Sequence, residues 1–62
     1  MNKAEMVEAI KENTKEQREL LNEAEEVYGD DKHWAVKRRR AKWMALEELC
    51  RDLGIEVDYD ND

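Results

Sequence analysis

The sequence predicts an all-α protein, folded as an antiparallel helical hairpin with an extended acidic C-terminal tail. Charged residues make up 45% of its 62 residues, and proline and phenylalanine are absent, which is unlike the composition of β-rich domains. Two segments, residues 3–28 and 32–53, repeat apolar side chains at the three-to-four spacing of a helix. A glycine and two aspartates separate these segments, as in a tight turn between two helices.

In the first segment, apolar and small side chains gather on one side of the expected helix. They cover roughly 160° of its circumference, which is wider than the seam of a two-stranded coiled coil and matches the face of a bundle helix. These residues are Met6, Val7, Ile10, Leu20, Leu21, Ala24, Val27 and Tyr28. Asn13, Thr14 and Gln17 add a polar layer to the middle of this face, and such a layer usually fixes register or oligomeric state.

The opposite side of the first helix forms an acidic ridge. Its members are Glu5, Glu8, Glu12, Glu16, Glu19, Glu23 and Glu26. Lys11, Lys15 and Arg18 line one flank of the ridge. Three pairs there have the spacing of helical ion pairs: Glu8–Lys11, Glu12–Lys15 and Lys15–Glu19. The central members of the ridge are candidate partner-binding residues: Glu12, Glu16, Glu19 and Glu23.

Two glycines mark the helix ends. Gly29 is expected to end the first helix in the left-handed conformation, and Asp30 or Asp31 is expected to cap the second helix. Gly54 is expected to end the second helix, with Ile55 folding back on it. Residues 1–54 therefore form one helical domain, and residues 55–62 form the tail.

The second segment carries a broad apolar arc. Cations interrupt this arc, and they belong to a basic run at residues 37–42. The arc consists of Trp34, Ala35, Ala41, Ala45, Leu46, Leu49, Cys50 and Leu53. Arg38 and Lys42 project from its middle, and Trp43 lies at its edge, nearly opposite Trp34.

A hairpin closed tightly at Gly29 and Asp30 sets a definite register between the helices. It places Arg38 near Leu21, Lys42 near Gln17, Ala45 near Thr14 and Leu49 near Ile10. Arg38 and Lys42 would then have to extend their charged ends to solvent or meet a glutamate, because a buried unpaired charge is strongly destabilising.

A domain of this size has a small core, so its stability needs support from elsewhere. Cys50 is the only cysteine, which excludes an internal disulfide, and one cysteine with one histidine is too few for the usual structural zinc site. Self-association is the remaining source of stability, and a homodimer forming a four-helix bundle is the expected assembly. No cofactor or metal ion is expected.

The sequence contains no motif of an enzyme active site. His33 lacks a neighbouring partner for a catalytic pair and is expected at the surface, whereas Cys50 is expected in the core. Lys3, Glu5 and Glu8 make the N-terminal segment unlike a signal peptide or a membrane span. We therefore expect a non-catalytic protein of the cytoplasm.

The tail alternates apolar and acidic side chains, in the order Ile55, Glu56, Val57, Asp58, Tyr59 and Asp60. This period of two favours a short strand or an extended arm. Such an arm would pack on the hairpin, pair with a second copy, or add to the sheet of a partner.

The basic run and its flanking tryptophans allow two interpretations. The run can complement an acidic helix of this chain or of a partner, with Trp34 and Trp43 in a core or anchoring an interface. Alternatively, the run contacts nucleic acid and one indole stacks on bases; the residues involved would be Lys37, Arg39, Arg40, Lys42 and Trp43. The cations point in several directions around the helix, which favours the first interpretation.

The plan of the chain is two helices of similar length, a tight glycine–aspartate turn and an acidic tail. This plan resembles that of Rop, a plasmid RNA-binding protein whose hairpins dimerise into a four-helix bundle. The resemblance extends to plan and size, and it implies RNA binding through helical hairpins. No residue motif is shared, and polar side chains interrupt the regular core repeat here.

The sequence thus predicts a small acidic protein–protein interaction module that associates with itself and regulates or inhibits a larger protein. Either the acidic ridge or the apolar arc near Trp34 and Trp43 would dock on a basic or apolar surface of that protein. Tiny acidic proteins of bacteriophages often act in this way, so a phage origin is consistent with its size and charge. Nucleic-acid binding and a purely structural role in an assembly are the alternatives. No membrane partner is expected.

Overall fold

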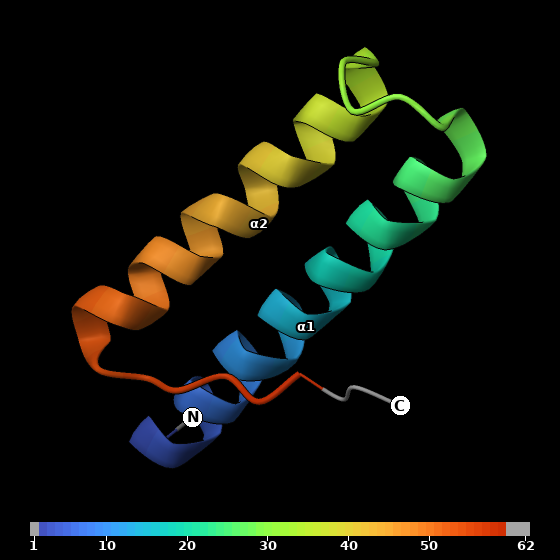
Figure 1. Ribbon diagram of the computed structural model, residues 1–62. Helices are drawn as coiled ribbons and strands as arrows, with labels where there is room; N and C mark the ends of the chain where they lie inside the picture. The colour runs from blue at the N-terminus through green and yellow to red at the C-terminus, as the bar shows by residue number, and fades with distance from the viewer. Residues whose placement is uncertain (1, 60–62) are drawn as a thin grey trace.

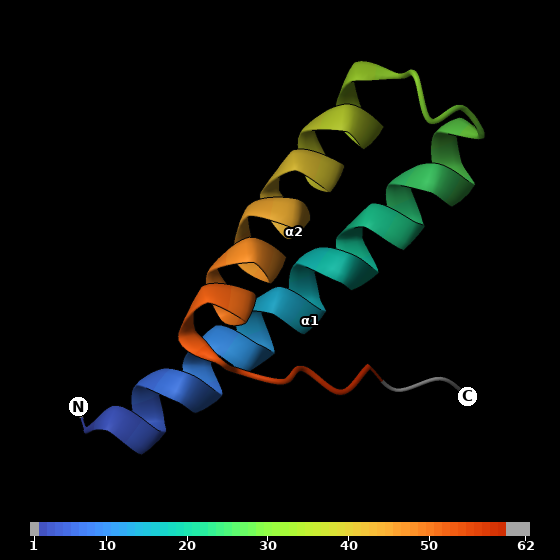
Figure 2. The same ribbon diagram turned by 60° about the vertical axis from the view of Figure 1, so that its left-hand side comes forward.

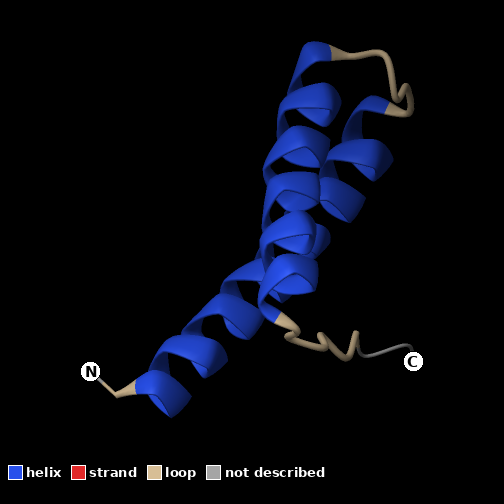
Figure 3. Cartoon of the chain, turned by 90° about the vertical axis from the view of Figure 1, so that its left-hand side faces the viewer, coloured by secondary structure: helices blue, strands red, loops and turns tan. Residues whose placement is uncertain are grey.

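The protein is a two-helix antiparallel hairpin (Figure 1). A computed structural model describes residues 2–59, in which α1 spans Lys3–Tyr28 and α2 spans Trp34–Leu53. The helices pack side by side along most of the length of α2, and residues 2–59 contain no strand (Figure 3). The predicted all-α hairpin is confirmed.

Both ends of α1 are capped by residues next to it in the sequence. The Asn2 side chain accepts a hydrogen bond from the backbone N–H of Glu5 at 2.8 Å. This contact satisfies one of the N–H groups that the first helical turn leaves free. At the other end, Gly29 adopts φ 61° and donates its N–H to the Glu25 carbonyl at 2.8 Å. Gly29 therefore ends the helix as the sequence predicts.

The connection between the helices is longer than predicted. Neither aspartate caps α2; Asp30 instead accepts a hydrogen bond from the N–H of Lys32, which closes a turn within the connection. His33 is the N-cap, because its Nδ1 accepts from the N–H of Ala35 at 3.1 Å. Consequently α2 begins at Trp34 and not at Lys32.

The side chains that face the opposite helix recur every seven residues. In α2 they are Val36, which is 0% exposed, the half-buried Trp43, and Cys50, which is 2% exposed. In α1 they include Thr14 and Leu21, both fully buried. This seam is narrow, as expected where each helix has one neighbour.

The face that α2 turns toward α1 differs from the predicted one. Most of the predicted apolar arc is at the surface: Trp34, Ala41, Ala45, Leu49 and Leu53 are exposed, and Ala35 and Leu46 are half-buried. Arg38 and Lys42 are exposed as well. The helix is rotated so that these two cations stay in water, because burying them without partners would be more costly than exposing leucines.

The register also differs from the predicted one. The Thr14 hydroxyl lies 3.6 Å from Cys50 Sγ, whereas Thr14 was expected against Ala45. Arg18 lies against Trp43, and Glu25 pairs with Arg40. The longer connection accounts for the displacement, because α2 starts later along the chain than a tight turn would allow.

The polar layer of α1 lies partly inside the seam. The Thr14 hydroxyl donates to the Ile10 carbonyl at 2.8 Å, so the Cys50 thiol is the donor in their contact. Asn13 is exposed, whereas the side-chain oxygen of Gln17 is buried and has no hydrogen-bond partner. The layer therefore joins the helices through Thr14 and leaves one polar atom unsatisfied.

The tail leaves α2 at Gly54 and runs back across the hairpin (Figures 1 and 2). Gly54 adopts φ 70°, and the Ile55 N–H donates to the Cys50 carbonyl at 2.8 Å, which confirms the predicted helix stop. Ile55, Val57 and Tyr59 are half-buried, while the acidic residues between them are exposed. The period of two thus matches an extended arm packed on the hairpin. Residues 60–62 of the predicted tail lie outside the described residues.

Candidate interaction surfaces

An open groove runs between the two helices near the connecting loop. It has a volume of about 550 Å³. Its α1 side is lined by Leu20, Glu23, Ala24, Val27 and Tyr28. Its α2 side is lined by Trp34, Ala35, Arg38, Arg39 and Lys42. We call this feature the loop-end groove.

The floor and rim of the loop-end groove expose large apolar side chains. Val27 is 75% exposed and Trp34 is 67% exposed. Both belong to apolar faces that are wider than one neighbouring helix can cover. Large apolar side chains gathered in a groove, with polar residues at the edges, are typical of surfaces that bind another molecule.

Aromatic rings organise the end of this groove. The rings of Tyr28 and His33 stack with centroids 4.0 Å apart and planes inclined by 15°. The Trp34 indole follows at 5.8 Å from the His33 ring. His33 is half-buried and not at the surface as predicted, because its imidazole caps α2 and supports these two rings.

The two walls of the groove carry opposite charges. Glu23 stands on the α1 wall, and the exposed Arg38 and Lys42 stand on the α2 wall. Within residues 2–59 these three side chains make no ion pair with one another. We call the α1 side of the groove the acidic wall and the α2 side the basic wall.

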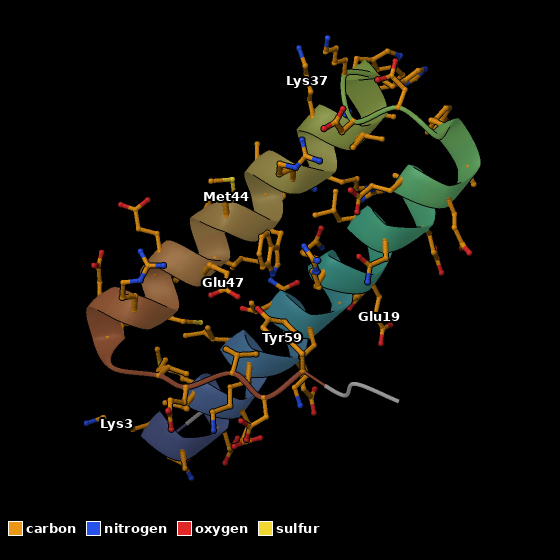
Figure 4. All side chains as sticks on the ribbon, viewed as in Figure 1. Lys3, Glu19, Lys37, Met44, Glu47 and Tyr59 are labelled. Atoms are coloured by element: carbon orange, nitrogen blue, oxygen red, sulfur yellow. The ribbon has the colours of Figure 1, made fainter. Side chains whose placement is uncertain are left out.

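The structure divides the basic run among several directions. Lys37 is exposed and points away from α1 (Figure 4), whereas Arg39 is half-buried in the groove. Arg40 pairs with Glu25 at 3.5 Å and donates to the Asp31 carbonyl. The residues of the nucleic-acid alternative, Lys37, Arg39, Arg40, Lys42 and Trp43, therefore do not share one surface.

Trp43 has a different environment from Trp34. Its ring lies under the Arg18 guanidinium, whose carbon is 4.6 Å from the ring centroid. Tyr59 meets the indole edge-on at 6.4 Å, and the indole N–H donates to the Tyr59 hydroxyl at 3.0 Å. A cation over one face and a hydrogen-bonded N–H hold the ring in place. Trp43 is thus half-buried, and only Trp34 of the two is largely open to solvent.

Tyr59 links the tail to α2 through its hydroxyl. The group donates to the Glu47 carboxylate while it accepts from Trp43 (Figure 4). Burial, followed by the hydrogen bond to Glu47, raises the pKa of Tyr59 to about 12. Both effects favour the neutral phenol, since ionisation would place two negative charges side by side.

The acidic ridge lies where the sequence predicts it. Glu12, Glu16, Glu19 and Glu23 are all exposed, and Glu19 points away from α2 (Figure 4). Of the three predicted helical ion pairs, only Lys11–Glu8 is within range, at 3.8 Å. Glu8 is therefore paired, whereas the four candidate partner-binding glutamates form no ion pair within residues 2–59.

Sequence reasoning missed two residues that shape these surfaces, Arg18 and Tyr59. Arg18 was expected on the flank of the acidic ridge, and its contact with Trp43 of the other helix was not predicted. Tyr59 belonged to an alternating pattern that indicated packing without identifying what it packs on. Neither contact has a local signal, because each joins positions far apart in the chain.

Comparison with protein families, with curated proteins and with solved structures finds no match to this chain. In the part of the chain that the structure describes, no helix is both long and apolar enough to cross a membrane. Nor do residues 2–59 bring three or more His, Cys, Asp or Glu side chains together in a group that could hold a metal ion.

Proposed function

We propose that this chain is a protein–protein interaction module of the cytoplasm that associates with itself and regulates or inhibits a larger protein by occluding a basic surface on it. The acidic ridge is the surface that binds this partner. The proposal gives the chain no catalytic role, no cofactor and no membrane partner.

The observation that carries the proposal is the exposure of Glu12, Glu16, Glu19 and Glu23 along one side of α1. A rigid helix holds these carboxylates in a row along the exposed side of the hairpin. Repeated negative charge on a rigid surface attracts a positively charged surface from a distance and sets its orientation. The net charge of -6 for the whole chain acts in the same direction.

The geometry supports protein binding over nucleic-acid binding. Binding to phosphates is strongest when many cations share one exposed surface. Arg38, Arg39 and Lys42 share the basic wall, but Lys37 points away from it and Arg40 pairs with Glu25, and the acidic wall faces the same groove. Stacking on bases requires an open indole face, and Arg18 lies over Trp43.

A capture experiment tests the acidic ridge. The purified chain is immobilised, retained proteins are identified by mass spectrometry, and the affinity of a purified partner is measured by calorimetry. Glu16→Lys with Glu19→Lys is expected to abolish capture. Glu48→Lys with Asp52→Lys is the matched control, since it changes the net charge equally at exposed positions of α2.

Three results would contradict the proposal. Undiminished capture by the Glu16→Lys, Glu19→Lys variant would dismiss the ridge as the binding surface. A salt-sensitive gel shift with generic RNA or DNA would favour the nucleic-acid alternative. Capture of nothing except further copies of the chain would favour a purely structural role.

A further inference from the structure

The loop-end groove leaves exposed the side chains that helical proteins ordinarily bury. Val27 and Trp34 are exposed, and the aromatic stack of Tyr28 and His33 fixes their surroundings. Residues 55–59 of the tail do not line this groove, and their Tyr59 contacts lie at Trp43 and Glu47, on the face of α2 turned toward α1. This end of the hairpin is a preformed surface that lacks an occupant.

The charges on the two walls specify the occupant. Glu23 on one wall and Arg38 on the other border the same groove, so they stand at the same level along the hairpin. An occupant must bring a cation to the acidic wall and a carboxylate to the basic wall. A second copy of this chain has both walls, at the matching level and the matching separation.

Only some symmetric arrangements match these walls. Two copies packed groove to groove are related by a two-fold axis lying in the interface. An axis perpendicular to the helices sets α1 against α1 and α2 against α2, so the walls meet with like charges. An axis parallel to the helices sets α1 of one copy against α2 of the other, so each acidic wall meets a basic wall.

We infer that two copies of this chain associate groove to groove about a two-fold axis parallel to the helices, with both connecting loops at the same end of a four-helix bundle. The inference rests on the self-association in the proposed function and specifies its surface. Trp34 of each copy enters the groove of the other, and Arg38 of each copy faces the other copy's Glu23. Within the dimer, Glu12, Glu16 and Glu19 are the ridge residues left for the larger partner, since they do not line the groove. A typical interface buries about 800 Å² per partner, which is a modest share of the 5032 Å² that the chain exposes.

Charge reversal tests the walls. Arg38→Glu and Glu23→Lys are each expected to weaken self-association about tenfold or more by sedimentation equilibrium, because the two-fold axis makes each substitution act twice. Mixing the two variants is expected to restore association, since each altered wall then meets an opposite charge. Lys37→Glu and Glu26→Lys are matched controls with the same charge changes at exposed positions outside the groove.

The position of the loops tests the axis. Asp31→Cys with Cys50→Ala allows a pyrene label at the loop, and two labels at the same end are expected to give excimer fluorescence that increases with protein concentration. An axis perpendicular to the helices would place the two loops on opposite sides of the shared groove, so their labels would not stack and would give no excimer.

Each contrary result is informative. A wild-type chain that stays monomeric at about 100 µM, where a dimer with a micromolar Kd would form, would overturn the inference and the self-association in the proposed function. The capture test of the acidic ridge would be unaffected. A dimer without excimer fluorescence, or one that Arg38→Glu leaves intact, would overturn the arrangement while self-association itself would stand. Trp34→Ala adds a second check, since it should weaken association, whereas Met44→Ala, equally apolar but outside the groove, should not.

Discussion

At the scale of single residues, the two tryptophans differ in what surrounds their rings. Trp43 has a cation over its face and a tyrosine at its edge, whereas Trp34 has one aromatic neighbour and is mostly open. The sequence indicated that they lie on nearly opposite sides of α2, and it could not show which one is covered. That choice depends on the rotation of α2, which is a property of the packed hairpin.

Tyr59 should make the stability of the protein depend on alkaline pH. Its pKa is raised to about 12 from an ordinary value of 10, so folding favours the neutral phenol. The stabilisation is fully present below pH 10 and is lost as the pH rises through the folded-state value. Urea unfolding between pH 10 and pH 12 is expected to show a steeper loss of stability for the wild type than for Tyr59→Phe.

Tyr28→Phe is the control for this pH dependence, because Tyr28 is exposed and near the loop. Tyr59→Phe should also lower stability at neutral pH by about 1 kcal/mol, since the Trp43 N–H loses its acceptor. Parallel pH curves for wild type and Tyr59→Phe would show that the hydroxyl is not held by Glu47 and Trp43.

The side chain of Gln17 is expected to destabilise the folded hairpin. Its side-chain oxygen is buried without a partner, and methionine has a similar length without that polar atom. Gln17→Met should raise the free energy of unfolding by about 1 kcal/mol in urea titrations at fixed protein concentration. Asn13→Met, at the exposed position one turn earlier, measures the effect of a methionine where no amide is buried. An equal gain at both positions would mean that the Gln17 oxygen is satisfied in solution.

At the scale of the elements, each helix ends where a left-handed glycine follows it. Gly54 has φ 70°, and a methyl group built there would meet no atom within 4 Å, so substitution would cost backbone strain alone. Gly54→Ala should therefore destabilise the protein by about 1 kcal/mol in thermal unfolding followed by circular dichroism. Gly54→Asn should cost less, because asparagine enters this conformation more readily. Equal stability of all three chains would argue against the left-handed helix stop.

The helix ends were largely predictable because their signals are local. The spacing of apolar residues and the two glycines identified α1 completely and the end of α2. The first residue of α2 was not predictable, because aspartate is a preferred N-cap and two aspartates precede the histidine that actually caps the helix, His33. The register depends on that start, so this local error displaced the predicted neighbour of Thr14 from Ala45 to Cys50.

The rotation of α2 could not be read from periodicity. One side of the helix offers Trp34, Leu49 and Leu53, and the other offers Val36, Trp43 and Cys50. Both sides are apolar enough to form a seam. The two rotations differ in free energy, because one buries Arg38 and Lys42 and the other exposes leucines. Which costs less depends on the neighbouring helix, and the apolar pattern of α2 alone does not show it.

At the scale of the whole molecule, one set of apolar residues holds the hairpin together and a second set remains at the surface. The exposure of Glu12, Glu16, Glu19 and Glu23 was predictable, because a row of charged residues on one side of a helix is not buried in a core. The loop-end groove was not, because its walls come from two helices whose rotation and register the sequence leaves open.

The contact between Thr14 and Cys50 has a practical consequence for following the motions of the molecule. The single thiol is shielded by the seam, so a reagent in solution can alkylate it only when the helices part. The alkylation rate of the natural cysteine therefore measures how often the two helices of the hairpin separate, and it needs no substitution in the chain.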